Sequence, residues 1–147
     1  MDTDGKEIKK ARLVARGCKQ NKSESAYAHV PSSTTIKIFL AIVANRDLKM
    51  VQMDVKAAYL NSYLSEEVYM IIPRGFPKEG ELCKLRKAIY GLRQASQAWI
   101  NEFESFMKEN KFSSSEADVC LYRKEKSDGR ENIYVLNYVD DILIASP

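Results

Sequence analysis

The sequence predicts an α+β domain in which an antiparallel sheet carries helices packed on one face. Two stretches of the chain place apolar residues at helical spacing. Several short runs are rich in β-branched and aromatic residues, and the last two flank a short polar turn, as in a β-hairpin. Helical and strand patterns follow one another irregularly along the chain, which favours this fold class.

Helices are predicted over residues 34–45 and 96–110. In the first, apolar side chains recur at i, i+3, i+4 and i+7, and Ser33 or Thr34 could cap its start. In the second they recur at i, i+4, i+7 and i+8, and this stripe is expected to face the core. The apolar positions are Ile36, Phe39, Leu40 and Val43 in the first helix and Trp99, Phe103, Phe106 and Met107 in the second.

Strands are predicted where β-branched and aromatic residues form short runs. Gly17 ends the first run, and Pro73 stops a later one. The last two strands are expected to form a hairpin with Asp140 and Asp141 at its tip. The predicted strands cover residues 11–15, 49–54, 68–72, 82–85, 133–138 and 142–145, with a short turn or helix at 57–60.

The composition indicates an ordinary globular chain. It has 147 residues, of which 45% are hydrophobic and 29% charged, a balance typical of a folded domain with its own core. No apolar run approaches the roughly 20 residues that a membrane helix needs, and the polar start lacks the apolar core of a secretory signal. The three cysteines are scattered without CxxC spacing, which argues against a zinc site or a disulfide framework and favours an intracellular setting.

Positive charge is concentrated near the start of the chain. The formal net charge is only +3, yet residues 6–22 hold seven basic side chains against one acid, Glu7. Such a cluster suits the phosphates of a nucleic acid or a nucleotide, and it also fits a solvated basic surface. The basic residues are Lys6, Lys9, Lys10, Arg12, Arg16, Lys19 and Lys22.

Three aspartates form a candidate metal site. Asp140 and Asp141 on their own fit a polar turn as well as a site, because aspartate is common in turns. Asp54 ends a predicted strand, and the three carboxylates converge if that strand neighbours the hairpin. Three oxygen donors suit two Mg²⁺ ions about 3.5–4 Å apart, which can stabilise the attacking and the leaving oxygen of a phosphoryl displacement.

Other common chemistries find little support in the sequence. His29 is the only histidine and lies in a polar stretch, so a Ser-His-Asp set has no other histidine to draw on. The chain contains neither a GxxxxGK[ST] phosphate loop nor a GxGxxG motif, which leaves kinase and ATPase chemistry without support.

Five motifs follow one another along nearly the whole chain. They are KARLVARG at 10–17, QMDVKAAYLN at 52–61, EVYM with PRGF at 67–70 and 73–76, KAIYGLRQA with Trp99 at 87–95, and YVDD at 138–141. In order and spacing they resemble the fingers motif, the first catalytic motif, the segment after it, the template and nucleotide motif, and the polymerase hairpin of copia-type LTR retrotransposon reverse transcriptases.

The resemblance implies a reverse transcriptase-like fold of fingers and palm. The fingers would comprise about residues 1–48 and 61–90, and the palm about residues 49–60 and 91–147. It implies a partial domain that is truncated before the thumb, with the thumb and the RNase H domain beyond Pro147. The second strand of the hairpin is then expected to be an exposed edge.

The resemblance also implies a metal site and a nucleotide site. Asp54, Asp140 and Asp141 would be catalytic and would ligate two Mg²⁺ ions, for which Mn²⁺ could substitute. The backbone carbonyl of Val55 would add a further ligand beside the nucleotide. Arginine suits the incoming triphosphate because its guanidinium is always charged and forks onto phosphate oxygens. The implied nucleotide-binding residues are Arg12 and Lys10 at the triphosphate, Tyr59 as a gate against a ribose 2′-hydroxyl, and Gln94 near the sugar and base.

Three further residues are implied to lie at the primer and template, namely Tyr138, Val139 and Gly91. One of these residues, Val139, and one nucleotide-binding residue, Tyr59, also have simpler interpretations. Tyr59 could be only a buried aromatic beside its strand, and Val139 could serve in strand packing alone.

The implied reaction is RNA-directed DNA synthesis, in which a primer 3′-hydroxyl attacks the α-phosphate of a dNTP on an RNA or DNA template. The partners would be the primer–template, dNTPs, and the missing polyprotein domains or a second copy, with no membrane. The setting would be cytoplasmic, in a retrotransposon particle, or nuclear. Two alternatives stay open at this stage, an inactive nucleic-acid-binding relic and a non-functional structural remnant.

Overall fold

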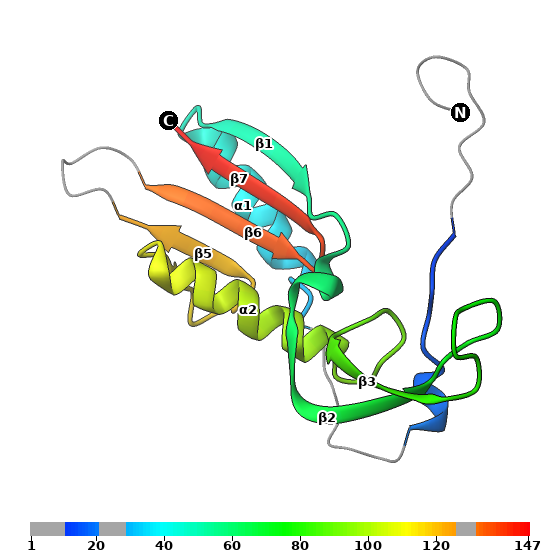
Figure 1. Cartoon of the computed structure of the whole chain (residues 1–147). Coiled ribbons are helices and arrows are strands. Elements are labelled where there is room, and N and C mark those ends of the chain that lie inside the picture. Colours follow the sequence, from blue (N-terminus) through cyan, green and yellow to red (C-terminus); the bar gives the residue numbers. More distant parts are fainter. Residues whose placement is uncertain (1–10, 21–28, 126–131) are drawn as a thin grey trace, which may run out of the picture.

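A computed structural model describes residues 11–20, 29–125 and 132–147 of the chain. Its main feature is a five-stranded antiparallel sheet with strand order β1-β7-β6-β5-β4, accompanied by a separate two-stranded ribbon, β2-β3 (Figure 1). The strands are β1 (Lys49–Asp54), β2 (Tyr63–Ile71), β3 (Leu82–Lys87), β4 (Ser113–Ser114), β5 (Leu121–Lys124), β6 (Ile133–Tyr138) and β7 (Asp141–Ser146). The helices are α1 (Ser33–Asn45) and α2 (Ala95–Glu109), with short 3₁₀ turns η1 (Gly17–Lys19) and η2 (Ala58–Asn61).

The two helices pack on opposite faces of the five-stranded sheet, so the prediction that they share one face is wrong. Alternate residues of β6 point to different clusters. Val135 joins the cluster of Trp99 and Phe103 from α2, whereas Leu136 joins the cluster of Phe39 from α1. In Figure 1, α1 is accordingly seen behind β6 and β7.

The reason lies in β6 itself. All four residues from Tyr134 to Asn137 are buried, and a strand that is apolar on both sides needs a covering layer on both sides. Neighbouring strands follow the same division, because cross-strand partners share a face. Tyr122 and Val135 are partners on the α2 face, and Leu121 and Leu136 are partners on the α1 face.

The edge strands of the sheet are β1 and β4, so the second hairpin strand is not at an edge. β7 pairs with β6 on one side and with β1 on the other, so the expectation of an exposed β7 is wrong. Among the described residues β1 has only β7 as a neighbour, and each of its six residues is exposed. Three of them are large and apolar, Met50, Val51 and Met53.

Helix α1 starts at a cap that a distant aspartate completes. The side chain of Ser32 accepts a hydrogen bond from the backbone N–H of Thr35 at 3.0 Å, so the cap lies one residue before Ser33 and two before Thr34, the predicted caps. The Asp118 carboxylate accepts from the backbone N–H of Ser32 at 3.0 Å and from the Thr35 hydroxyl at 2.5 Å. Its other oxygen accepts from the backbone N–H of Cys120 at 3.0 Å. Asp118 therefore ties the start of α1 to the loop before β5.

Replacing Asp118 with alanine is expected to lower the free energy of unfolding by about 1–3 kcal/mol, because hydrogen-bond donors lose a charged acceptor. Burial acts to raise the pKa of Asp118, but hydrogen bonds from Thr35, Ser32 and Cys120 outweigh it, and the pKa lies below its ordinary value. The stabilisation is therefore full above the ordinary aspartate pKa of about 3.9 and is lost as pH falls through the lowered folded-state value.

Urea denaturation of wild type and Asp118→Ala between pH 7 and pH 2.5 measures this difference. The gap between the two proteins should narrow in the acid range, while the exposed neighbour Glu116→Ala should differ little from wild type at pH 7. A gap that is constant with pH would show that the charge of Asp118 does not stabilise the cap.

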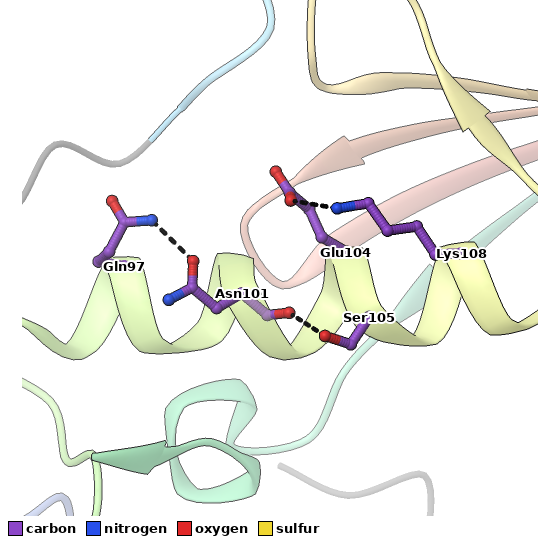
Figure 2. A network of polar contacts seen from close by, with 5 residues as sticks. All are labelled: Gln97, Asn101, Glu104, Ser105 and Lys108. Atoms are coloured by element: carbon purple, nitrogen blue, oxygen red, sulfur yellow. Dashed lines mark hydrogen bonds and ion pairs between the residues drawn. The ribbon is translucent and has the colours of Figure 1, made fainter. Parts of the chain in front are cut away.

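Helix α2 has one buried and one solvated side. Trp99, Phe103 and Met107 are buried, as the apolar stripe predicts, but Phe106 is 59% exposed. The solvated side carries polar contacts between residues one helical turn apart (Figure 2). These are Gln97 Nε2 to Asn101 Oδ1 at 2.9 Å, Ser105 Oγ to the Asn101 carbonyl at 2.9 Å, and Lys108 Nζ to Glu104 Oε2 at 3.3 Å. Exposed pairs of this kind contribute little, about 0.3–0.5 kcal/mol each, so α2 is held mainly by its buried side.

The segment predicted as a strand at 11–15 has no strand structure. It instead crosses the loop before α2 at close range, where the backbone N–H of Ala15 donates to the carbonyl of Tyr90 at 2.7 Å. Two glycines allow the crossing. A Cβ on Gly17 would lie 2.0 Å from the carbonyl oxygen of Gly91, and one on Gly91 would lie 2.1 Å from that of Ala15.

None of the helices within the described part of the chain combines the length and the apolar character needed to cross a membrane.

Candidate active site

The hairpin β6-β7 turns through two residues. Tyr138 and Asp141 are cross-strand partners, so Val139 and Asp140 form the turn. The prediction placed both aspartates at the tip, but only Asp140 lies in the turn, and Asp141 is the first residue of β7. Val139 has a positive φ of 59°, a conformation that a β-branched residue adopts only under constraint from its surroundings.

The strand that carries Asp54 lies beside this hairpin. Asp54 at the end of β1 is the cross-strand partner of Asp141. The next residue, Val55, donates its backbone N–H to the carbonyl of Asp140 at 2.8 Å, and Gln52 Nε2 donates to Asp141 Oδ1 at 3.2 Å. This register places the backbones of the three aspartates together at the same end of β1, β6 and β7.

The donor set suits a hard divalent cation in its chemistry. All three side chains supply carboxylate oxygens, Asp54 and Asp141 are exposed, and Asp140 is half-buried, which leaves room for the waters that Mg²⁺ keeps when it binds protein. Among the described residues, however, no three acidic, histidine or cysteine side chains stand close enough together to form a ready metal site. The strand register therefore brings the backbones of the three aspartates together, whereas their side chains form no metal-binding cluster among the described residues.

Trp99 of α2 is hydrogen-bonded to the main chain of the turn. Its indole Nε1–H donates to the carbonyl oxygen of Val139 at 2.6 Å, and its ring is 6% exposed. The ring packs on Phe103 with centroids 5.8 Å apart. The constrained turn is thus fixed by a side chain from the core.

Replacing Trp99 with phenylalanine is expected to lower the free energy of unfolding by about 1–3 kcal/mol, because the Val139 carbonyl loses its donor while a ring still fills the cluster. Urea denaturation measures the loss. The variant Tyr122→Phe removes a polar group from the same cluster without affecting the turn, and it should cost less. Equal stability of Trp99→Phe and wild type would contradict the role of this hydrogen bond.

Tyr59, on η2, is half-buried and is in contact with two of the clusters, the one under α2 and the one between the ribbon and the start of α2. This packing resembles the simpler alternative, a buried aromatic beside its strand, except that the side chain is only half-buried. It does not exclude a role as a gate, because the residue is only partly covered.

One side chain that the sequence prediction did not assign lies in contact with two of the candidate site residues. Tyr90, in the loop before α2, packs edge-to-face on Tyr59 with ring centroids 4.7 Å apart. The Arg12 guanidinium also lies over the Tyr90 ring, 5.1 Å from its centroid. The only hint in the sequence was the position of Tyr90 inside the KAIYGLRQA motif, which does not say what its side chain touches.

The phenol of Tyr90 also lies within the field of the aspartates. Burial raises the pKa of Tyr90, and the negative charge of Asp140 raises it further, while the Arg12 guanidinium lowers it. Smaller contributions that raise it come from Tyr59 and Asp54. Charged side chains of the hairpin turn, of β1 and of the N-terminal segment therefore all act on the pKa of Tyr90.

Gln94 and Gly91 lie in the same loop, and Gln20 ties Gln94 to the N-terminal segment. Gln20 Nε2 donates to Gln94 Oε1 at 3.0 Å, and Gln20 Oε1 accepts from the backbone N–H of Arg93 at 2.9 Å. Arg93 Nε donates in turn to the carbonyl of Gly17 at 3.0 Å. Sequence reasoning missed Gln20, because its partners lie more than 70 residues away along the chain.

The basic cluster is described only in part. Arg12, Arg16 and Lys19 are exposed, and Lys10, assigned to the triphosphate, lies outside the described residues together with Lys6, Lys9 and Lys22. Tyr138, assigned to the primer, is 47% exposed beside Asp141.

The sequence of residues 2–147 matches the protein family described as reverse transcriptase (RNA-dependent DNA polymerase). The chain is 41% identical over 141 residues to the retrovirus-related Pol polyprotein from transposon TNT 1-94 of Nicotiana tabacum, and equally to that from transposon RE2 of Arabidopsis thaliana. Each of these alignments covers 92% of this chain, and the chain spans 10% of each relative. It is also 38% identical over 98 residues to the putative transposon Ty5-1 protein of Saccharomyces cerevisiae, covering 65% of this chain and 31% of that protein. No solved structure matches it.

Proposed function

The chain belongs to the reverse transcriptase family, and from that membership we propose that it forms part of an RNA-directed DNA polymerase of a copia-like retrotransposon. The observation that carries the proposal is the register of β1 against the hairpin. It brings Asp54 opposite Asp141, while the backbone N–H of Val55 binds the carbonyl of Asp140. A site for nucleotidyl transfer from a dNTP to a primer 3′-hydroxyl fits this end of the strands.

Asp54, Asp140 and Asp141 would hold two divalent cations, Mg²⁺ with Mn²⁺ as a substitute, together with the carbonyl of Val55. When bound, such ions supply charge stabilisation for the attacking and leaving oxygens of an in-line displacement. The protein's own contribution is to fix the positions of the donors. Main-chain pairing fixes Asp54 and Asp141, and the Trp99 hydrogen bond fixes the turn that carries Asp140.

The incoming nucleotide would lie between the N-terminal segment and the loop before α2. Arg12, with Lys10, would bind the triphosphate, and Tyr59 would exclude a ribose 2′-hydroxyl. Gln94 would contact the sugar and base in the orientation that Gln20 imposes on its amide. Tyr138, Val139 and Gly91 would lie at the primer and template, where contacts to the backbone suit an enzyme that accepts any sequence.

We also propose that the five-stranded sheet is a palm and that the β2-β3 ribbon belongs to the fingers. The packing of α1 against the sheet favours counting residues 33–48 with the palm. The curated relatives are Pol polyproteins from transposons, so a thumb, an RNase H domain or a second copy of the chain would act as partners, inside the cell.

Primer extension tests the proposal. Purified chain, a primer–template and labelled dNTPs should give template-directed products that require Mg²⁺ or Mn²⁺ and disappear with EDTA. Binding of the primer–template should weaken with salt, because phosphate contacts release counterions. Salt-dependent binding without extension would favour the alternative of an inactive binding relic, and the absence of both would contradict the proposal.

A further inference from the structure

One aromatic side chain links the two ends of the nucleotide site. The Tyr90 ring is in contact with Tyr59, the proposed sugar gate, at 4.7 Å between centroids. The same ring lies 5.1 Å from the guanidinium of Arg12, the proposed triphosphate ligand. Arg12 and Tyr59 come from separate segments of the chain, and Tyr90 is in contact with both.

The backbone that carries Tyr90 is firmly placed. Its carbonyl accepts from Ala15 at 2.7 Å, and the residues two before and two after it, Ala88 and Leu92, are both buried. The next residue, Gly91, has a φ of 86° and lies against the backbone of Ala15. A ring on such a backbone can support its neighbours in fixed positions, because the backbone that carries it has little freedom to move.

We propose that Tyr90 is a specificity-determining positioning residue of the nucleotide site. Its ring supports Tyr59 at the depth at which that side chain discriminates deoxyribose from ribose, and it provides the surface on which Arg12 stacks. The hydroxyl group is not required for either contact, since both involve the ring. The inference rests on the proposed function and identifies what sets its sugar selectivity.

Two substitutions separate the ring from the hydroxyl. Tyr90→Leu removes the surface that both neighbours use, so Tyr59 gains freedom and Arg12 loses its stacking partner. Tyr90→Phe keeps that surface. The control is Tyr63→Leu, which removes a tyrosine that also lies under a cation, Lys87 at 5.1 Å, on the ribbon.

The measurement is single-nucleotide addition to a primer–template with dATP or ATP, giving kcat and KM for each. Tyr90→Leu should lower the ratio of kcat/KM for dATP to that for ATP by about fivefold, the size expected from one aromatic contact, and should raise KM for dATP. Tyr90→Phe and Tyr63→Leu should keep the wild-type ratio. A purely structural role would lower kcat for both nucleotides alike and leave the ratio unchanged.

A second readout needs no catalysis. The Arg12 side-chain Nε–H resonance should be shifted by the Tyr90 ring current in wild type and in Tyr90→Phe, and it should move to its ordinary position in Tyr90→Leu. Retention of the wild-type ratio by Tyr90→Leu would overturn the inference alone. A wild-type chain that adds neither nucleotide would contradict the proposed function, and the role of Tyr90 with it.

Discussion

Replacing Asp140 with asparagine is expected to lower nucleotide addition by about 10²–10³-fold, the range found when one preorganised charge-stabilising group is lost. Asparagine keeps the size of the side chain and removes its negative charge. The backbone contact of this residue is unaffected, because Val55 donates to the main-chain carbonyl and not to the side chain. The turn should therefore persist while the affinity for divalent cations falls. The same change at Asp54, whose strand pairing also uses only the backbone, should act alike.

The matched control is Asp47→Asn, the same chemical change at an exposed residue outside the site. Asp47 has a positive φ of 49°, which asparagine also tolerates, so folding should be preserved. Steady-state primer extension across a Mg²⁺ titration distinguishes the variants. Activity of Asp140→Asn comparable to that of Asp47→Asn would rule out the proposed role of the carboxylate.

Replacing Gly91 with alanine is expected to lower the free energy of unfolding by about 3 kcal/mol, the upper end of the range for one strained residue. Two costs combine there. The φ of 86° is unfavourable for any residue with a Cβ, and the added carbon would lie 2.1 Å from the Ala15 carbonyl and 2.7 Å from Val14 Cγ1. The chain can relieve the contact only by separating the N-terminal segment from the loop, which would also remove Arg12 from Tyr90.

Gly80→Ala separates these two costs. Gly80 has a nearly equal φ of 84°, but a Cβ there would meet nothing within 4 Å. It should lose only the backbone contribution, about 1–2 kcal/mol, so the difference between the variants reports the close crossing. Urea denaturation gives both values, and dNTP binding should weaken only in Gly91→Ala. Equal losses in the two variants would mean that the crossing is not a stabilising contact.

The regular elements were largely predictable, because local pattern determines them. The strand at 49–54 and the helix at 96–110 were predicted to within one residue at each end, since each shows a clear periodic pattern between polar end residues. The strand Leu121–Lys124 was missed, because it is short and only its first two residues are apolar, followed by two charged ones. The placement of α1 and α2 on opposite faces was not predicted, although the apolar run of residues 133–136 in β6 indicates a strand covered on both sides.

The residues of the candidate site were less predictable from the sequence than the regular elements. The aspartates could be assigned as candidates because their residue type and motif indicate the chemistry. Tyr90 and Gln20 could not, because their importance lies in contacts with Arg12, Tyr59 and Gln94 across long sequence separations. Arg12 itself was assigned to a strand that does not exist, since tertiary contacts with the Tyr90 loop replace the pairing that its β-rich neighbours suggested.

The exposed strand β1 has a practical consequence for handling the protein. Its outer main-chain N–H and C=O groups can pair with the same strand of another copy, and Met50, Val51 and Met53 add apolar surface beside them. Unprotected edges of this kind are sites of aggregation. Light scattering of purified protein should therefore rise with concentration, and Val51→Lys should delay the rise. Because Asp54 closes the same strand, aggregates joined along β1 would also cover the site, so specific activity should fall in concentrated stocks.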